Sequence, residues 1–498
     1  MSSTNSIVLV MVIYLVLVGV VGYLSSRLRA ISTKIDYFLA GRALKPFVLV
    51  FTLAFAQMSA FCLMGMAGLG YRGGFSIPMM FGTICLIFDA LGIYVIGTRS
   101  WGLSKKFGYI SPASLIGDRW QSRLVTYIVF ALLLYYLIPY IELGAVGGGK
   151  IFASLTNNAV PYEIGAGIVI GALLFYIVTG GMRGMAWTNV VQGMIMTGLL
   201  IFMLLSFSIK FSPSGLTEKV ISVNPKLLAL AGSPHLPWGT IFSWFIIIGT
   251  SVSTFPHLIL RAMSAENEVS LRKTIVAFGA VTMAVTYMSS FMGAWGRGLV
   301  PGLSEAQSEA ILPILASKYF PAIVSGILGA GILAAAMSTM DGQVFAISVM
   351  FAEDIISPLW PKMTEAKSVI VGRLLVVAVC AIAFVLALFR PTTILRIGEW
   401  ALSGYVCMGP AFVGALYWKR CSKWGAIASL VVPALLLPLF FLGYMPKLPF
   451  GLLPVVPALI LSVALLVVVS LLSPDKLTRK GEEWFAFFTE WRESKERR

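Results

Sequence analysis

Charged side chains are scarce in this sequence. Of its 498 residues only 12% are Asp, Glu, Lys or Arg, 58% are hydrophobic, and two are histidines. A soluble protein of this length could not cover so much apolar surface with so few polar groups. The composition therefore excludes a soluble globular protein and predicts an all-α integral membrane protein.

The usual marks of an enzyme are also missing. The sequence shows no nucleophile–base pair, no metal-ligand cluster and no phosphate-binding glycine loop, so we expect no enzymatic activity. Cysteines are few and have no Cys-x-x-Cys spacing, which predicts small apolar residues inside membrane helices. They are Cys62, Cys85, Cys380, Cys407 and Cys421.

No polar stretch is long enough to form a separate soluble domain. About thirteen apolar runs reach the roughly 20 residues that cross the hydrocarbon of a bilayer. The first run, near residues 6–25, lacks a preceding basic segment and a small-residue cleavage site, which predicts a retained span rather than a signal peptide. We predict a single transmembrane domain over residues 1–472, with its core at about 46–418, and an amphipathic cytoplasmic tail at 473–498.

The net charge of +16 could suggest a nucleic-acid partner. In a membrane protein, however, such an excess reflects the positive-inside bias of the loops. The uncharged start MSSTNS precedes the first span, and the loop after it carries five basic residues, namely Arg27, Arg29, Lys34, Arg42 and Lys45. This pattern predicts a multi-pass protein of the inner or plasma membrane with its N-terminus outside and its C-terminus in the cytoplasm, and no nucleic-acid partner.

One apolar run contains a small polar face. Within GILAAAMSTMDGQ at residues 331–343, Ala335, Ser338 and Thr339 are spaced so that they share one side of a helix. Hydroxyl oxygens, together with a carbonyl that Ser and Thr leave partly free, are ligands that a hard alkali cation takes. Small residues of this kind also serve close helix packing, so the stretch alone leaves both interpretations open.

Two other spans are polar at mid-membrane. In the second span, about 46–70, the segment around Gln57 and Ser59 is followed by glycines, and in the seventh span residues 249–256 read GTSVSTFP. Broken helices at membrane depth are tolerated only where the freed backbone lines a cavity. Because these segments lie five spans apart, they predict an inverted five-plus-five repeat with a binding site between two broken helices.

Three carboxylates lie alone in apolar spans: Asp89 in the third, Glu142 in the fourth and Asp341 in the ninth. A charge at membrane depth is costly, so such residues are candidates for function. Pairing with a basic residue, or a protonated form, is the structural alternative. Near the C-terminus, Trp484, Phe487, Phe488 and Trp491 share one helical face, which predicts an amphipathic helix on the inner leaflet, or else a protein contact.

Five stretches, in order and on the expected spans, resemble the sodium:solute symporter family. They are DYFLAGRALKPF at 36–47, MSAFCLMGMAGLGYRGG at 58–74, GGMRGMAWTNVVQG at 180–193, FPHLILRAMSA at 255–265 and AAAMSTMDGQ at 334–343. The chain looks nearest to the pantothenate, monocarboxylate and proline-type bacterial symporters. The resemblance covers about residues 6–470 and implies thirteen spans around a leucine-transporter-like inverted repeat.

The resemblance also implies one site for a co-transported sodium ion, between the second and ninth spans. By motif position its ligands would be the carbonyl oxygens of Phe55, Met58 and Ala335 and the hydroxyl oxygens of Ser338 and Thr339. A substrate site would lie beside it. Its implied lining residues are Ser59, Phe61, Gly65, Tyr140 and Ile248.

Two departures from the family pattern bear on coupling. Proline-type members carry a carboxylate where this chain has Gln57, and many members carry Asp where it has Asn189. We expect a short loop at 180–193 between the fifth and sixth spans, with Asn189 opening the sixth. The second acid is linked in the family to a further sodium ion or to coupling, so its absence argues for a single ion. Gln57 and Asn189 therefore join Asp89, Glu142 and Asp341 as coupling candidates.

Together these features predict a sodium-coupled secondary symporter that imports a small organic solute, a carboxylate or an amino acid, by alternating access. Phe61 and Ile248 stand where proline-type members place tryptophans, which weakens an assignment to proline itself. Proton coupling through a buried carboxylate is the first alternative. A membrane sensor that uses this fold is the second, and the sequence leaves the oligomeric state open.

Overall fold

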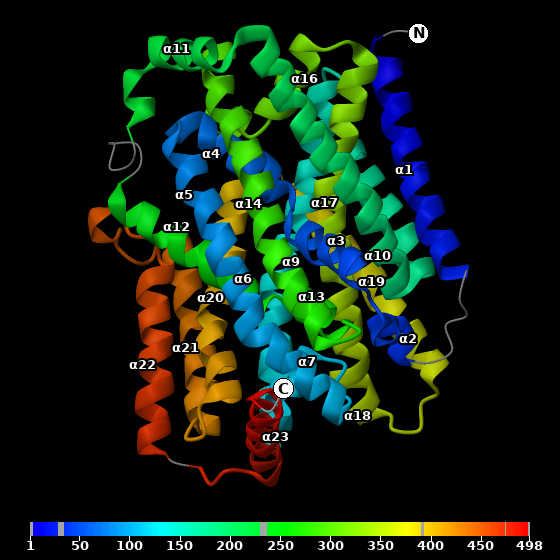
Figure 1. Ribbon diagram of the computed structural model, residues 1–498, viewed down its shortest axis with the longest axis vertical. Coiled ribbons are helices and arrows are strands. Elements are labelled where there is room, and N and C mark those ends of the chain that lie inside the picture. Colours follow the sequence, from blue (N-terminus) through cyan, green and yellow to red (C-terminus); the bar gives the residue numbers. More distant parts are fainter. Residues whose placement is uncertain (1–2, 28–33, 230–236, 390–392, 474, 497–498) are drawn as a thin grey trace.

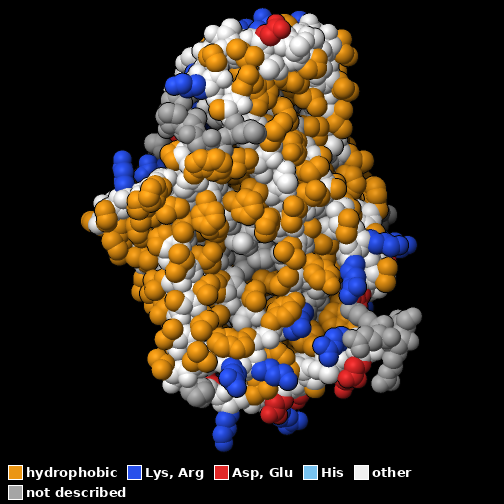
Figure 2. Space-filling view, turned by 60° about the vertical axis from the view of Figure 1, so that its left-hand side comes forward, with side chains coloured by type: hydrophobic (Ala, Val, Ile, Leu, Met, Phe, Trp, Pro, Cys, Tyr) orange, Lys and Arg blue, Asp and Glu red, His pale blue; other side chains and the backbone are white. Residues whose placement is uncertain are grey.

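The computed structural model describes residues 3–27, 34–229, 237–389, 393–473 and 475–496. These residues form helices joined by short turns, and their one extended pairing is an isolated parallel bridge between Leu44 and Ala265. Most of the long helices run along the long axis of the molecule (Figure 1). Hydrophobic side chains cover most of the face seen in Figure 2, and Lys and Arg gather at its lower end.

Nine helical segments of the described chain are long and apolar enough to cross a membrane. They are α1 (Ser3–Arg27), α5 to α7 (Ser76–Phe107), α9 (Arg123–Leu155), the second half of α10 (Gly181–Phe211), α14 (Glu268–Leu299), α17 with its continuation into α18 (Ala322–Leu359), α19 (Glu365–Leu388), α21 (Lys423–Phe441) and α22 (Val455–Leu472).

Two further spans are broken. Helix α3 (Pro46–Gln57) is followed, at an angle of 63°, by the segment Phe61–Gly73, which contains α4 (Met66–Gly73). Helix α12 (Trp238–Ser251), with a short turn through Thr254, meets α13 (Pro256–Met263) at 45°. Pro256 has no N–H to continue the earlier helix and is suited to the first position of the next. Both interruptions predicted from the sequence are present.

Two more helices complete the expected order. The first half of α10 (Tyr162–Phe211) is a shorter apolar helix, Tyr162–Val178. The other is α20 (Ile394–Tyr417), which packs against α9, α12, α21 and α22. The nine long segments and the two bent pairs are the eleven described spans long and apolar enough to cross a membrane, and these two helices stand where the sequence predicts the fifth and eleventh of about thirteen.

One predicted boundary is wrong. Residues 180–193, expected as a loop, are helical except for a break at Gly181, where φ is +57° and ψ is −164°. Only glycine adopts this backbone conformation without strain, so one residue separates the fifth span from the sixth. Asn189 therefore lies about two turns inside the sixth span instead of opening it.

Helix α17 (Ala322–Met350) lies at the centre of the bundle. In the most apolar 18-residue stretch of the span that it begins, 83% of the residues are buried, a larger share than in any other long span of the described residues. It packs against α1, α3, α9, α10, α13 and α19. Its small residues allow these helices to approach closely, which places the face of Ser338 and Thr339 inside protein and away from lipid.

The C-terminal helix α23 (Arg479–Glu496) packs on the protein. Trp484 is 1% exposed, and the Trp491 ring lies 6.1 Å from that of Trp101 in α7 (Thr98–Phe107). The Trp491 indole N–H also donates to Glu268 at the start of α14, at 3.0 Å. Of the two possibilities that the sequence leaves open for this aromatic face, the protein contact is the one present.

Helices α4 and α14 touch backbone to backbone, which gives a first prediction. A Cβ atom on Gly293 would lie 1.9 Å from the carbonyl oxygen of Ala67, so Gly293→Ala must push the two helices apart. We expect a loss of about 3 kcal/mol, the upper end of the range for overpacking. Thermal unfolding of the purified protein in detergent measures it. Gly171→Ala is the control because its Cβ would meet nothing within 4 Å, and equal melting temperatures for both variants would contradict the close contact.

Candidate functional site

The polar face of α17 meets the end of α3. The Ser338 hydroxyl donates to the carbonyl oxygen of Phe55 at 2.7 Å and lies 3.2 Å from that of Ala335. Thr339 Oγ1 is buried without a hydrogen-bond partner. The four side chains are at most 2% exposed. Three of the five residues expected to hold sodium, Phe55, Ala335 and Ser338, therefore meet at this junction, and Thr339 follows Ser338 in the same helix.

Met58, the fifth residue of that set, forms the break itself. Its N–H donates to the carbonyl oxygen of Ala54 at 3.1 Å, and its ψ of 76° ends the helix. Met58 is the centre of an inverse γ-turn, in which the N–H of Ser59 donates to the carbonyl oxygen of Gln57 at 2.8 Å, and helical structure resumes at residue 60. A break of this kind turns backbone carbonyls away from the helix axis, which is how half-helices supply ligands to ions at the membrane midplane.

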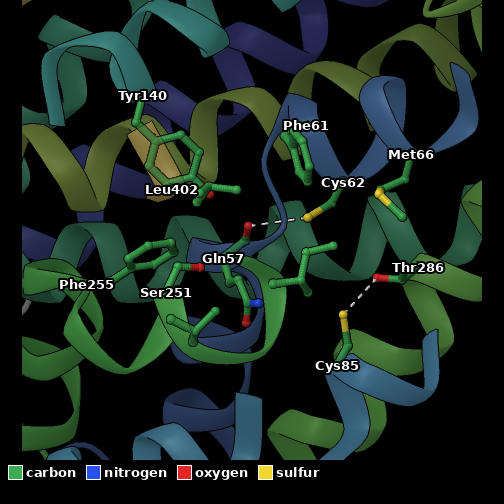
Figure 3. A pocket seen from close by; sticks show the side chains of 12 residues that line it. Gln57, Phe61, Cys62, Met66, Cys85, Tyr140, Ser251, Phe255, Thr286 and Leu402 are labelled. Carbon is green, nitrogen blue, oxygen red and sulfur yellow. Dashed lines mark hydrogen bonds between the residues drawn. The ribbon is translucent and has the colours of Figure 1, made fainter. Parts of the chain in front are cut away.

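A small cavity lies beside the break (Figure 3). Its volume is about 30 Å³, room for a group of water size and well below the volume of a ligand pocket. Of the expected substrate residues, Phe61, Tyr140 and Ile248 line it, and so does Gln57. Ser251 and Phe255 from the second broken span face it as well, so the cavity lies between the two breaks.

Two expected substrate residues are not in this lining. The Ser59 hydroxyl accepts a hydrogen bond from the N–H of Phe61 at 3.2 Å and so supports the turn. Gly65 packs against the Phe61 ring, 3.4 Å from the position of a Cβ. Sequence reasoning missed eight lining residues, Cys62, Met66, Cys85, Ser251, Val252, Phe255, Thr286 and Leu402. Their spans carry no polar signal at these positions, apart from the break that includes Val252.

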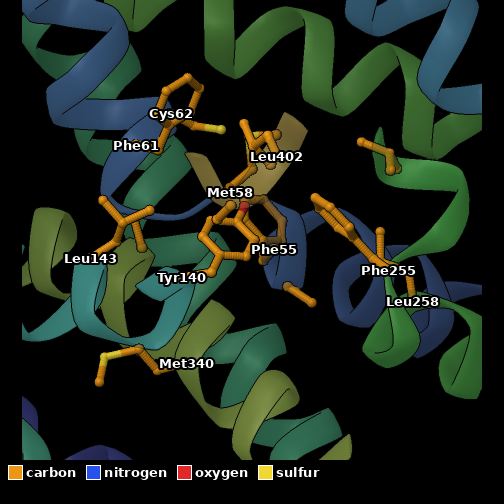
Figure 4. Close-up of a cluster of buried hydrophobic side chains, with 14 of the residues drawn as sticks. Phe55, Met58, Phe61, Cys62, Tyr140, Leu143, Phe255, Leu258, Met340 and Leu402 are labelled. Carbon is orange, nitrogen blue, oxygen red and sulfur yellow. The ribbon is translucent and has the colours of Figure 1, made fainter. Parts of the chain in front are cut away.

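Aromatic and aliphatic side chains close the space around the break (Figure 4). The Tyr140 ring lies 5.5 Å from that of Phe255, which in turn packs on Tyr405 at 4.9 Å. Phe61 stacks on Trp244 at 5.8 Å. These contacts join the fourth, seventh and eleventh spans to the second and keep the surroundings of the polar groups largely apolar.

The coupling candidates fall into three places. At the cavity wall, Gln57 Nε2 donates to Asp89 Oδ2 at 2.6 Å, and Asp89 is fully buried behind it. Glu142 is 9% exposed and does not line the cavity, although Tyr140 two residues earlier does. The third place, around Asp341, is a network of its own.

Asp341 pairs with a basic residue. Arg261 Nη2 lies 3.3 Å from Asp341 Oδ1, and both side chains are buried. With the Asn189 amide oriented to suit its neighbours, its nitrogen donates to Asp341 Oδ2 at 3.1 Å and its oxygen accepts from Arg261 at 2.9 Å. The network joins α10, α13 and α17, one turn below the hydroxyl face.

Apolar spans, two broken helices and a small cavity between them define a membrane-embedded secondary transporter with an inverted-repeat core. The sequence profile of the sodium:solute symporter family matches residues 37–432, and the chain belongs to this family. It is therefore a sodium-coupled solute symporter of the plasma membrane, and not an enzyme.

Curated relatives match along most of their length. The high-affinity proline transporter of Bacillus subtilis is 29% identical over 407 residues, covering 80% of this chain and 85% of its own. The osmoregulated proline transporter of the same organism is 27% identical, with 88% and 89% covered. The sodium/proline symporter of Staphylococcus aureus is 28% identical over 488 residues, with 94% and 92% covered.

Solved structures share the fold. A Na⁺-coupled sialic acid symporter, captured substrate-bound and outward-open, superposes with a TM-score of 0.76 at 15% identity, covering 95% of this chain and 99% of its own. A nucleobase-cation-symport-1 family transporter superposes with a TM-score of 0.55 at 13% identity, covering 90% and 97%. At these identities the likeness extends to the arrangement of the helices alone.

Proposed function

We propose that the protein imports a small amino acid, or else a small carboxylate, together with one sodium ion per solute molecule. The observation that carries this proposal is the contact of Ser338 with the carbonyl of Phe55, two residues before Gln57 of the cavity wall. The relatives named as proline transporters make proline the first solute to test. Phe61 and Ile248 line the cavity, so the departure from tryptophan at these positions falls where it would alter the choice of solute.

The sodium ion would bind to five uncharged oxygens. They come from the carbonyls of Phe55, Met58 and Ala335 and from the hydroxyls of Ser338 and Thr339. Such ligands suit a monovalent cation, whose charge needs no carboxylate to balance it. A serine hydroxyl has a donor hydrogen as well as acceptor lone pairs, so Ser338 can donate to Phe55 and would offer a lone pair to the ion.

The solute would bind in the cavity between the two breaks. Tyr140, Gln57 and Ser251 offer polar groups there, and Phe61, Ile248 and Phe255 supply apolar surface. The volume of about 30 Å³ holds only a group of water size, so the cavity would have to widen to admit the solute. Ser59 and Gly65 would act indirectly, through the turn and through the position of the Phe61 ring.

Coupling would arise because sodium holds the broken second span against α17. This favours the outward-open state, in which the solute then binds more tightly, and the usual scale of such coupling is about 1–3 kcal/mol. Rocking of one helix bundle against the other would then open the inner side and separate the ligand oxygens. Gln57 with Asp89, and Asn189 with Asp341, lie where they would sense this movement, whereas Glu142 lies apart.

The proposal includes the orientation and the division of the chain. Residues 1–472, with the core at about 46–418, would form one transport unit with the N-terminus outside. The tail at residues 473–498 would lie in the cytoplasm, as the distribution of basic residues predicts.

Uptake by proteoliposomes tests the function. We expect labelled proline or a related small solute to accumulate at least about tenfold faster with an inward sodium gradient than without one, because the ion supplies the driving force. A panel of small amino acids and carboxylates, competed against one another, identifies the preferred solute. Accumulation driven by a pH gradient in sodium-free buffer would instead support proton coupling, and solute binding without any transport would support a sensor.

A further inference from the structure

A basic cleft lies between α23 and the ends of α7, α14 and α20. It is lined by Arg99, Arg272, Lys419 and Arg492, with Glu268 as the acidic residue among its lining side chains. Glu268 is already engaged, because Arg272 pairs with it at 2.7 Å and the Trp491 indole donates to it at 3.0 Å. The cleft therefore carries a surplus of positive charge at the edge of the apolar surface.

The basic groups of this cleft are held by aromatic rings. The Arg99 guanidinium lies 3.6 Å from the centre of the Tyr417 ring and 4.2 Å from that of Phe488. Lys419 Nζ lies 5.6 Å from the Phe485 ring. Neither Arg99 nor Lys419 forms an ion pair with an acidic residue of the described chain. Arg99 Nη1 donates to the carbonyl oxygen of Leu416, which leaves the other N–H groups of Arg99 and the Lys419 ammonium for an anion that enters the cleft.

An apolar groove continues from the cleft toward the middle of the membrane. Tyr417 belongs to both, and its hydroxyl donates to the carbonyl oxygen of Val95 at 2.8 Å. Beyond Tyr417 the groove runs between Leu91 and Val413, and α22 contributes Leu459 to it. Figure 2 shows the face of the molecule on which α12 and α20 to α22 lie. The cleft has a volume of about 590 Å³ and the groove one of about 610 Å³.

We propose that cleft and groove together bind one anionic phospholipid. The phosphate lies among Arg99, Arg272 and Lys419, and an acyl chain follows the groove past Tyr417. A zwitterionic lipid carries a cation that the surplus of arginine and lysine repels, whereas an anionic headgroup complements it. An isolated phosphate ion would use the cleft and leave the groove without an occupant.

The lipid would also touch the transport machinery. At its far end the groove is lined by Thr250 and Ser253, which belong to the second broken span. An acyl chain there packs against the same break whose other side, at Ser251 and Val252, lines the solute cavity. The occupant of the groove is therefore placed to influence the rate of transport, whichever solute is carried.

Two matched pairs of variants test the site. Arg272→Gln with Lys419→Gln removes two charges from the cleft. Lys106→Gln with Lys273→Gln removes two exposed charges that do not line it, one at the C-terminal end of α7 and one beside Arg272 in α14. Gly409→Leu fills the groove from a position where a Cβ meets nothing within 4 Å. Gly171→Leu is its control, with an equally open Cβ position outside the groove.

Native mass spectrometry of the purified full chain, titrated with dioleoyl-phosphatidylglycerol or dioleoyl-phosphatidylcholine, measures binding. We expect one tightly held phosphatidylglycerol, bound at least about tenfold more weakly by the charge variant and by Gly409→Leu, and unchanged in both controls. Equal affinity for the two lipids would overturn the proposal, as would unchanged binding in the two test variants. The proposal would also be overturned if inorganic phosphate displaced the lipid and Gly409→Leu bound phosphatidylglycerol as tightly as the wild type does. A free anion would then be the ligand of the cleft.

Discussion

Replacing Thr339 with alanine is expected to raise the sodium concentration for half-maximal uptake by about tenfold or more, because one lost ligand costs about 1.4 kcal/mol or more. Thr339 Oγ1 is buried and has no hydrogen-bond partner, so its removal leaves no other group unpaired. The effect should therefore fall on the ion and spare the folding of the protein. Initial rates of solute uptake by proteoliposomes over a range of external sodium concentrations measure it.

Two further variants test whether the hydroxyl oxygens of Thr339 and Ser338 are the groups that bind sodium. Thr339→Ser keeps the hydroxyl oxygen and should retain most of the wild-type sodium dependence. Ser338→Ala removes both a ligand and the hydrogen bond to Phe55, and should weaken sodium dependence at least as much as Thr339→Ala. If Thr339→Ala and Ser338→Ala are both well expressed and both keep the wild-type sodium dependence, the ion does not bind at this face.

The second large effect concerns the buried pair of Arg261 and Asp341. Arg261→Met should destabilise the protein by about 3–5 kcal/mol, because it leaves the Asp341 carboxylate without a cation in a site that water does not reach. The double variant Arg261→Met with Asp341→Leu should recover much of this loss, since no charge is then left unpaired. Thermal unfolding of the purified variants in detergent compares the two.

A control for this prediction lies on the surface. Lys273→Met removes an exposed basic residue and should leave the melting temperature nearly unchanged. The buried pair would be unimportant if Arg261→Met melted at the wild-type temperature. A double variant less stable than either single variant would mean that Asn189 and the neighbouring groups require both charges.

The broken spans could be predicted because their cause is local. Polar residues and glycines around Gln57, and Pro256 after a polar run, are out of place in an apolar helix and mark where it ends. The face of Ser338 and Thr339 follows equally from helical spacing. The choice of Phe61, Tyr140 and Ile248, by contrast, came from the family resemblance, and all three line the cavity.

What the sequence could not supply depends on contacts between distant spans. Thr286 and Leu402 reach the cavity from helices that show no local signal, so only the packing of the bundle places them there. The partner of Asp341 lies 80 residues away, and that of Asp89 lies 32 residues away, so neither pairing could be read from spacing along a helix. The predicted loop at 180–193 failed because a single glycine replaces it.

That glycine has a practical consequence for mapping the topology of the protein. Since Gly181 alone separates two membrane crossings, the chain has almost no slack there to accept an inserted epitope, a protease site or a fused reporter enzyme. A negative result from such an insertion would report a disrupted helix pair and say nothing about which side of the membrane it faces. Labelling of a single introduced cysteine is the better approach at this end of the molecule.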